Sequence, residues 1–336
     1  MESQANQSLP GAAATWSYLA TRLTGEEMTL LRGFLTDLQS DLTRQTYLYS
    51  TKRFMASHSG SLLAVTGEAL RGWASAALTS MNRLTVKATL IALRAFFNHA
   101  CRVQSNLRHP FDGLRLRLPT VRDAEAVGMA SKVLTPGQIR TVCERLDAEE
   151  TRLGKEFPGG FLWRFLAGTG LRVSEALSLN FYDPAREGEA NYVNYVRVLH
   201  DGRCLVRVLG KARRVRDVLL GEELSEAFTR KFPSGTIDAG APVFITHDIR
   251  RTRLSRHGAH WEAKRVAEKF MYDFPGGMSK RFHLHMLRHA LCTTLLCDQG
   301  ADPIHVARLM GHSPQMLARV YLHGTRDLLK GLRLAS

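Results

Sequence analysis

The sequence predicts a mainly helical protein of two domains, with one small antiparallel β-sheet in the second domain. At 336 residues the chain is long for a single hydrophobic core, which favours two domains. Apolar residues recur with helical spacing along most of it. β-Branched runs gather in one stretch, from about 191 to 220, where NYVNYVRVL, CLVRVLG and VRDVLL follow one another. A hydrophobic content of 44% is ordinary for a folded globular protein.

The first domain is predicted to be a helical bundle over residues 25–108, preceded by a disordered segment, 1–24, that begins with small and polar residues. Its clearest helix is 83–103, because one face is apolar at helical spacing. That face holds Val86, Leu90, Leu93, Phe97 and Ala100. The opposite side carries Lys87 and Arg94, seven residues apart, and could lie along a phosphate backbone. For a single helix, a solvated face is the simpler interpretation.

Residues 109–134 are predicted to form a basic linker, because prolines and glycines break the periodicity there and arginines such as Arg115 and Arg117 lie among them. Thr135 and Pro136 have the pattern of a helix start, so the second domain is expected over 135–323. The tail, 324–336, is rich in leucine, which is too apolar for a terminus without a packing partner.

The chain is strongly basic, with a net charge of +15 and an isoelectric point near 10.0. Both parts contribute, since residues 1–130 hold 14 Lys and Arg against 9 Asp and Glu, and the remainder holds 32 against 22. A polyanionic partner follows, and DNA or RNA fits better than a membrane surface. A basic surface without a partner is the remaining alternative.

Five cysteines without paired spacing indicate free thiols and a reducing compartment. The first 16 residues lack the basic start and apolar core of a secretion signal. We therefore expect a cytoplasmic protein.

Arginines, histidines and one tyrosine occupy positions where helices begin or end. Arg172 follows a Gly-Thr-Gly break at the predicted start of a helix, and His285 and Arg288 share one helical face. His312 lies in a tight corner between two predicted helices, and Tyr321 follows two turns later.

These residue types suggest phosphoryl transfer. A phenol with a pKa near ~10 is a weak nucleophile unless its surroundings activate it. Two arginines can hold the non-bridging oxygens of a phosphodiester, histidines can move protons, and a lysine can protonate the leaving alkoxide. The sequence has no Walker loop, no HExxH motif and no acidic metal cluster, so we expect no metal or other cofactor. A zinc site of His283, His285 and His289 is disfavoured, because this spacing does not converge on one helical face.

Taken together, HMLRH, LMGH and a tyrosine nine residues later resemble the signature of the tyrosine recombinases, the phage integrase family. GTGLRVSEAL looks like the first arginine box of that family, and VLGKARRVRDVLL looks like its β-hairpin lysine segment. RLTVKATLIALRAFF with HPFDGLRLRLP resembles its N-terminal domain. The resemblance implies a helical core-binding domain followed by an α+β catalytic domain.

Carried over residue by residue, the resemblance implies that Arg172 and Arg288 clamp the scissile phosphate and that Lys211 is the general acid. His285 assists proton transfer, His312 hydrogen-bonds the phosphate, and Tyr321 is the nucleophile that becomes joined to the DNA 3′ end. Glu175, one turn after Arg172, is expected to support the Arg172 side chain. DNA contacts are expected from Lys87, Arg94, Arg115, Arg117, Arg213 and Arg214.

The chain departs from the family pattern around the lysine. Ala212 stands where the family often has glycine, and 39 residues separate Arg172 from Lys211, with an apparent insertion around 184–200. Lys231 or Arg213 could therefore take the place of Lys211.

The resemblance further implies double-stranded DNA with paired half-sites as substrate, in integration, resolution or excision of DNA elements. It implies a dimer on each site and a tetramer in synapsis, with the tail 324–336 in contact with a neighbouring protomer. It also implies possible accessory proteins and a bacterial cytoplasmic location on the nucleoid. A type IB topoisomerase-like enzyme and a catalytically inert DNA-binding protein remain alternatives.

Overall fold

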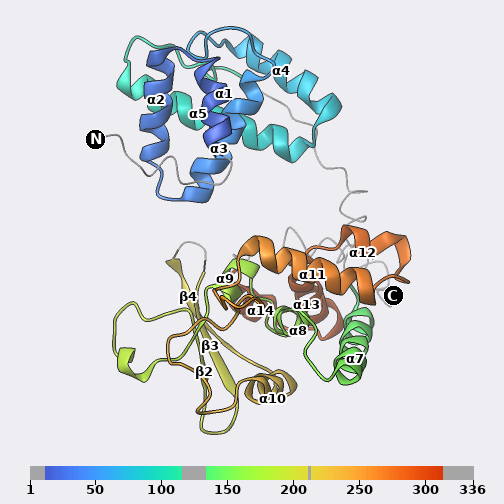
Figure 1. Ribbon diagram of the computed structural model, residues 1–336. Helices are drawn as coiled ribbons and strands as arrows, with labels where there is room; N and C mark the ends of the chain where they lie inside the picture. Colours follow the sequence, from blue (N-terminus) through green and yellow to red (C-terminus); the bar gives the residue numbers. More distant parts are fainter. Residues whose placement is uncertain (1–11, 116–133, 211–212, 313–336) are drawn as a thin grey trace, which may run out of the picture. The chain divides into compact units, whose positions relative to one another are not determined.

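The computed structural model describes residues 12–115, 134–210 and 213–312. The chain divides into two compact units, Met1–Thr120 and Val121–Ser336, and the division lies within the predicted linker 109–134 (Figure 1). Within the described ranges, none of the helices combines the length and the hydrophobicity that a membrane crossing requires.

The first unit is a bundle of helices around one apolar core. Its helices are α1 (Ala12–Ala20), α2 (Gly25–Thr36), α3 (Asp41–Met55), α4 (Gly67–Ser80) and α5 (Arg83–Val103). The long α5 packs against α2, α3 and α4. All five residues predicted for its apolar face are buried, with relative exposures of 6% or less, so the helical spacing located this core correctly.

The first unit extends beyond its predicted limits at both ends. The prediction of disorder over 1–24 is wrong for residues 12–20, which form α1 and bury Leu19 completely. A short helix whose buried positions include Ala12 and Thr15 gives little signal in the sequence, because neither residue is strongly hydrophobic. The predicted linker also begins too early, since Phe111 is buried in the core of this unit.

The second unit combines helices with a sheet. Its helical segments are α7 (Pro136–Leu153), α8 (Gly160–Thr169), α9 (Val173–Leu177), the 3₁₀ turn η2 (Pro184–Arg186), α10 (Glu222–Lys231), α11 (Arg256–Phe270), the 3₁₀ turn η4 (Pro275–Gly277), α12 (Met278–Arg281), α13 (His285–Thr293), the π-helical segment η5 (Thr294–Asp298) and α14 (Pro303–Met310). Thr135 caps α7 with Pro136 at its first turn, as predicted.

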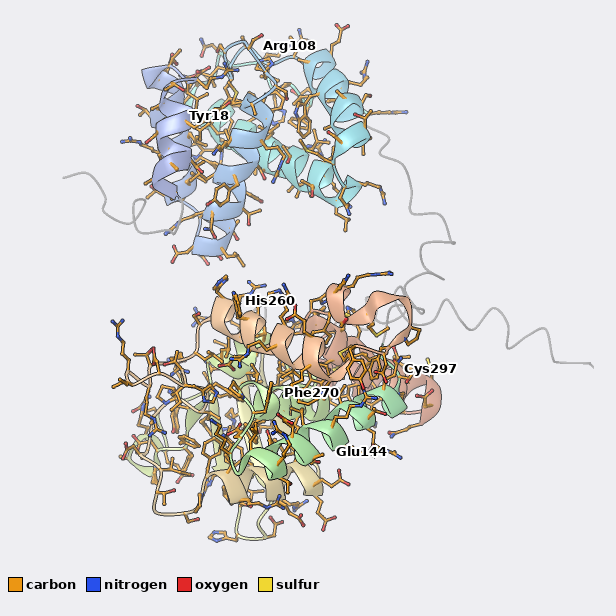
Figure 2. All side chains as sticks on the ribbon, turned by 45° about the vertical axis from the view of Figure 1, so that its right-hand side comes forward. Tyr18, Arg108, Glu144, His260, Phe270 and Cys297 are labelled. Atoms are coloured by element: carbon orange, nitrogen blue, oxygen red, sulfur yellow. The ribbon has the colours of Figure 1, made fainter. Side chains whose placement is uncertain are left out.

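The core of this unit surrounds α8, most of whose residues are buried, and α8 packs against α7, α11 and α13. Figure 2 shows Phe270 of α11 in this interior, whereas Glu144, His260 and Cys297 are exposed. All five cysteines are free thiols, as the sequence predicts.

The sheet has four strands in the order β1-β2-β3-β4. They are β1 (Asn180–Phe181), β2 (Tyr195–Val198), β3 (Cys204–Leu209) and β4 (Val215–Leu219). The three predicted strands pair antiparallel, with Val206 opposite both Val196 and Val218. The sheet as a whole is mixed, because the two-residue β1 pairs parallel to β2. A strand this short has no detectable period, which is why the sequence does not reveal it.

The apparent insertion around 184–200 is part of the sheet layer. It contains β2, and the rings of Tyr192 and Tyr195 stack with centroids 4.6 Å apart. Asn194 accepts a hydrogen bond from the backbone N–H of Leu209 at 2.9 Å. This segment therefore holds the end of β3, immediately before Gly210 and Lys211 in the sequence.

Candidate active site

Arg172 lies where α8 ends and α9 begins. Gly170 ends α8 with a φ of 62°, and a Cβ at this position would lie 2.7 Å from the Met310 sulfur, so glycine is needed here. Arg172 then caps α9: its backbone N–H donates to Glu175 Oε2 at 2.8 Å, and its Nη1 donates to Oε1 at 2.7 Å. Its Nη2 donates to the carbonyl of Gly311 at 3.2 Å.

Arg288 reaches the same place from α13. Its side chain is buried, Nη1 donates to Gly170 O at 2.5 Å, and Nη2 donates to Met310 O. Burial and the charge of Arg172 lower the pKa of Arg288 to about 10, so the group is still a cation at neutral pH. Within the described residues, its buried Nε has no hydrogen-bond partner.

His312 follows the C-cap of α14, Gly311, whose φ is 60°. The His312 backbone N–H donates to Ala307 O at 2.9 Å. Its Nδ1 is buried and has no partner among the described residues. Burial, Arg288 and Arg172 lower the pKa of His312 to about 3, so its imidazole is neutral at neutral pH.

His285 begins α13, and its ring meets that of His289 edge to face at 4.5 Å. Desolvation, followed by the neighbouring His289 and Arg288, lowers the pKa of His285 to about 4. Both candidate histidines are therefore uncharged beside the two arginines.

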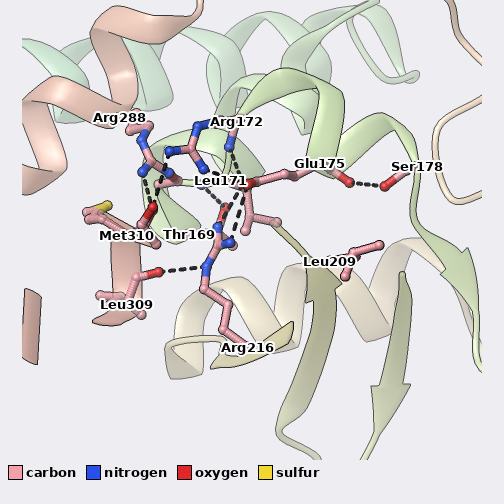
Figure 3. A network of polar contacts seen from close by, with 12 residues as sticks. Thr169, Leu171, Arg172, Glu175, Ser178, Leu209, Arg216, Arg288, Leu309 and Met310 are labelled. Carbon is pink, nitrogen blue, oxygen red and sulfur yellow. Dashed lines mark hydrogen bonds and ion pairs between the residues drawn. The ribbon is translucent and has the colours of Figure 1, made fainter. Parts of the chain in front are cut away.

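Glu175 and Arg216 complete the cluster (Figure 3). Glu175 is 5% exposed, and although burial raises its pKa, hydrogen bonds from Arg216 and Arg172 hold the pKa below its ordinary value. Arg216 of β4 donates from Nη2 to Glu175 Oε2 at 2.7 Å, from Nη1 to Oε1 at 3.2 Å, and from Nε to Leu309 O at 3.0 Å.

Arg216 is the residue of this cluster that the sequence analysis missed. A signal was present, because Arg216 alternates with Val218 and Leu220, both of which are buried. An arginine on the inward face of a strand needs a partner in the interior. The position of Glu175 beside Arg172, in contrast, was predicted correctly.

The remaining predicted site residues either lie outside the described residues or are described at other positions. Lys211, Tyr321 and Arg117 lie outside the described residues. Lys87, Arg94, Arg115, Arg213 and Arg214 are described and exposed. Lys231, the alternative general acid, forms an ion pair with Glu156 and lies over the ring of Phe161 at 5.2 Å.

The cluster has the chemistry of an anion site. Three guanidinium groups, of Arg172, Arg216 and Arg288, surround one carboxylate, that of Glu175, which leaves an excess of two positive charges. Among the described residues, no group of three or more His, Cys, Asp or Glu side chains could hold a metal ion, and this includes His283, His285 and His289. An α+β domain with clustered arginines that can fork onto oxygen pairs is typical of proteins that bind phosphate groups.

Residues 132–327, more than half of the chain, match the sequence model of the Phage integrase family. The chain belongs to this family. It is a tyrosine-type site-specific DNA recombinase.

Relatives resemble it over most of their lengths. The tyrosine recombinase XerD of Yersinia pestis is 26% identical over 289 residues, which are 85% of this chain and 86% of that protein. The tyrosine recombinase XerC of Listeria innocua serovar 6a is 25% identical over 262 residues, 75% of each chain. XerC of Mycobacterium sp. (strain KMS) is 27% identical over 311 residues, 88% of this chain and 92% of the relative.

Solved structures share the fold. The Tn1549 transposon integrase in complex with transposon right end DNA superposes with a TM-score of 0.62 at 19% identity, covering 94% of this chain and 98% of that one. The XerH site-specific recombinase bound to palindromic difH substrate gives a TM-score of 0.59 at 18% identity, covering 86% and 78%. The family and these relatives favour a recombinase over a topoisomerase-like enzyme and over an inert DNA-binding protein.

Proposed function

We propose that the chain cleaves and rejoins duplex DNA at paired half-sites through a 3′-phosphotyrosyl intermediate, with Tyr321 as nucleophile. The observation that carries this proposal is the uncompensated positive charge around residues 310–312, where Arg172 and Arg288 both donate to backbone carbonyls. A phosphodiester entering there reduces this excess charge.

The two arginines and His312 suit the phosphate-binding role. A guanidinium can donate two parallel hydrogen bonds to a phosphate, and such charge-assisted bonds are strong in a partly buried site. The buried Nε of Arg288 and Nδ1 of His312, which lack partners among the described residues, supply further polar atoms for a phosphate oxygen. A neutral His312 carries one ring N–H and can donate it to a phosphate oxygen when the protonated nitrogen is the one that faces the phosphate.

The chemical step is a transesterification. The Tyr321 oxygen forms a bond to phosphorus, the bond from phosphorus to the 5′ oxygen breaks, and Lys211 gives a proton to that departing oxygen. The neutral imidazole of His285 accepts the proton that leaves the Tyr321 hydroxyl. Rejoining reverses these steps, so the phosphodiester energy is conserved and no nucleotide cofactor is consumed.

The described end of β3 supports Lys211 as the acid. Gly210, the residue before Lys211, lies against the cluster: a Cβ built there would be 3.6 Å from Glu175 Oε1. Its backbone N–H donates to Arg214 O at 2.8 Å. Lys231, already paired with Glu156, is a poorer candidate.

We further propose that the helical unit is a core-binding domain and that the chain acts as a dimer on each site and a tetramer in synapsis. The proteins in two of the solved structures were bound to transposon right end DNA and to difH substrate, which supports duplex DNA as the partner of this chain. The bacterial relatives support a place on the nucleoid in the bacterial cytoplasm.

The test compares two nicked suicide duplexes, one with an ordinary 5′ bridging oxygen and one with sulfur in its place. Lys211→Ala should slow single-turnover cleavage of the oxygen substrate by about 10²–10⁴-fold, the usual contribution of a general acid. The variant should recover on the sulfur substrate, because a thiolate, with a reference pKa near ~8.5, scarcely needs protonation.

Arg172→Ala and Arg288→Ala are the matched controls. Both should stay defective on either substrate, since their task is to bind the non-bridging oxygens. A Lys211→Ala defect of equal size on the two substrates would assign Lys211 an electrostatic role and move the search for the acid to Arg213, Arg214 or Lys231.

A further inference from the structure

One guanidinium joins three parts of the catalytic unit that are distant in the sequence. Arg216 extends from β4 to the Glu175 carboxylate of α9, and also to the Leu309 carbonyl of α14, at 2.7 Å and 3.0 Å (Figure 3). Its side chain is 10% exposed. Glu175 in turn binds both the backbone N–H and the Nη1 of Arg172.

Two glycines enclose this guanidinium. A Cβ at Gly210 would lie 2.8 Å from Arg216 Nη1, and a Cβ at Gly311 would lie 2.9 Å from the same atom. Neither position has room for a side chain while Arg216 keeps its place. Gly210 directly precedes Lys211, and Gly311 directly precedes His312. Arg216 therefore lies against the backbone next to two candidate catalytic residues. It also binds the Glu175 carboxylate, which holds a third, Arg172.

We propose that Arg216 is a positioning residue that sets the Lys211 hairpin against Arg172 and His312. This inference rests on the proposed roles of those three residues. The guanidinium is planar, with five donors in a fixed arrangement, so its bonds to Glu175 and to Leu309 fix the distance between β4 and α14. A lysine ammonium can neutralise Glu175 but has no rigid fork that reaches both partners.

Stability alone does not account for this arrangement. A buried ion pair often contributes little to stability, because desolvation of both charges offsets their attraction. A misplacement of about 1 Å in a catalytic group, however, can lower a rate by about 10²-fold.

The first experiment measures single-turnover cleavage by Arg216→Lys on the oxygen and sulfur suicide duplexes. We expect a loss of about 10²-fold on the oxygen substrate. Part of that loss should return on the sulfur substrate, because sulfur removes the need for a well-placed acid. A wild-type rate on oxygen, or an equal loss on both substrates, would overturn the proposal.

The second experiment is a double-mutant cycle between Gly210 and Arg216. Gly210→Ala should slow cleavage of the oxygen substrate in the wild-type background, because the added methyl displaces the guanidinium. In an Arg216→Gln background the same methyl should cost little further rate, since the shorter side chain leaves space. Additive losses would show that the two positions act independently, against the proposal.

Arg207→Gln is the matched control. Arg207 pairs with Asp217 at 2.8 Å across the same two strands, but both side chains are exposed, so this variant should cleave at the wild-type rate. Thermal unfolding and DNA affinity of every variant are measured alongside. If Arg216→Gln fails to fold, Arg216→Lys and Gly210→Ala still test the proposal, because both keep a positive charge beside Glu175.

Tyr321→Phe separates this inference from the function on which it rests. A persisting covalent adduct in Tyr321→Phe contradicts the proposed function. Loss of the adduct in Tyr321→Phe together with wild-type cleavage by Arg216→Lys contradicts the positioning role of Arg216 alone.

Discussion

The His312 side chain is a neutral imidazole beside two positively charged arginines. Burial and two adjacent arginines keep its ring neutral, with a pKa of about 3. Desolvation, followed by the neighbouring His289 and Arg288, lowers the pKa of His285 as well. If a phosphate binds beside His312 as proposed, its negative charge would raise the pKa of this ring, and substrate binding would favour proton uptake.

The lowered pKa of His312 also makes stability depend on pH. An unfolded histidine binds a proton near pH ~6.5, whereas the folded His312 does not until about pH 3. Its contribution to stability is therefore complete above the unfolded pKa and is lost as the pH falls from 6.5 toward 3. We expect the melting temperature of the free protein to drop between pH 7 and pH 5, and to drop less in His312→Asn.

His200→Asn, at an exposed position between β2 and β3, is the control for loss of an imidazole. Comparison of the two variants shows whether a changed pH dependence is particular to position 312. An identical pH dependence in wild type and His312→Asn would contradict the low pKa of His312.

Residue patterns predicted where two of these side chains lie. Gly170, Gly311 and Pro303 mark helix ends, so the sequence located Arg172 and His312 at corners where a side chain is held firmly. The alternation with Val218 and Leu220 indicated that Arg216 points inward, but its partner Glu175 is 41 residues away in sequence, and the local pattern does not identify that partner.

At the scale of elements, α5 presents a mixed exposed stripe. Lys87 and Arg94 are exposed, as predicted, and Leu84 and Ile91 on the same stripe are 67% and 50% exposed. The Arg94 guanidinium lies over the Phe111 ring at 4.9 Å, which holds it in place. The two cations of this stripe could contact a phosphate backbone.

If α5 faces DNA, Lys87→Ala and Arg94→Ala should each weaken binding. The slope of log affinity against log salt should fall by about one unit for each phosphate contact removed. Arg32→Ala is the matched control, because Arg32 is exposed in the same unit and lies over the Trp16 ring at 5.6 Å. An unchanged slope in both α5 variants would indicate that this side of the helix faces solvent and not DNA.

Long helices and strands were predicted from the sequence, and the shortest ones were not. The 21-residue α5 and the six-residue β3 repeat their pattern often enough to be recognised. The two-residue β1 and the short α1 do not, and their places depend on packing against β2 and α3.

At the scale of the whole molecule, the two-domain organisation followed from length and from the break in periodicity over 109–134, and the two units of the structure agree with it. The boundary of the first unit could not be predicted in the same way. Phe111 lies within the predicted linker but packs into the first core, and no local sequence pattern indicates that packing. The net charge of +15 suits a polyanionic substrate.

The leucine-rich tail gives a prediction about assembly. Leu328, Leu329, Leu332 and Leu334 are apolar enough to need a partner surface, and we propose that a neighbouring protomer supplies it. Deletion of residues 325–336 should leave binding to a single site intact and impair synapsis, measured by mobility shift with one-site and two-site DNA. Normal recombination by the truncated chain would contradict this proposal, and Leu328→Ser with Leu329→Ser would test the apolar contact alone.

The central claim is that Tyr321 becomes joined to DNA, and a trapped covalent adduct tests it most directly. Two other tyrosines are the alternatives. The Glu187 carboxylate raises the pKa of Tyr182 to about 12, so a smaller fraction of this phenol is ionised at neutral pH, and Tyr272 is exposed beside Arg145. On a nicked suicide duplex, the wild type, Tyr182→Phe and Tyr272→Phe should form the adduct, and Tyr321→Phe should bind the DNA with unchanged affinity but form none. An adduct that persists in Tyr321→Phe and disappears in Tyr182→Phe or Tyr272→Phe would contradict the account.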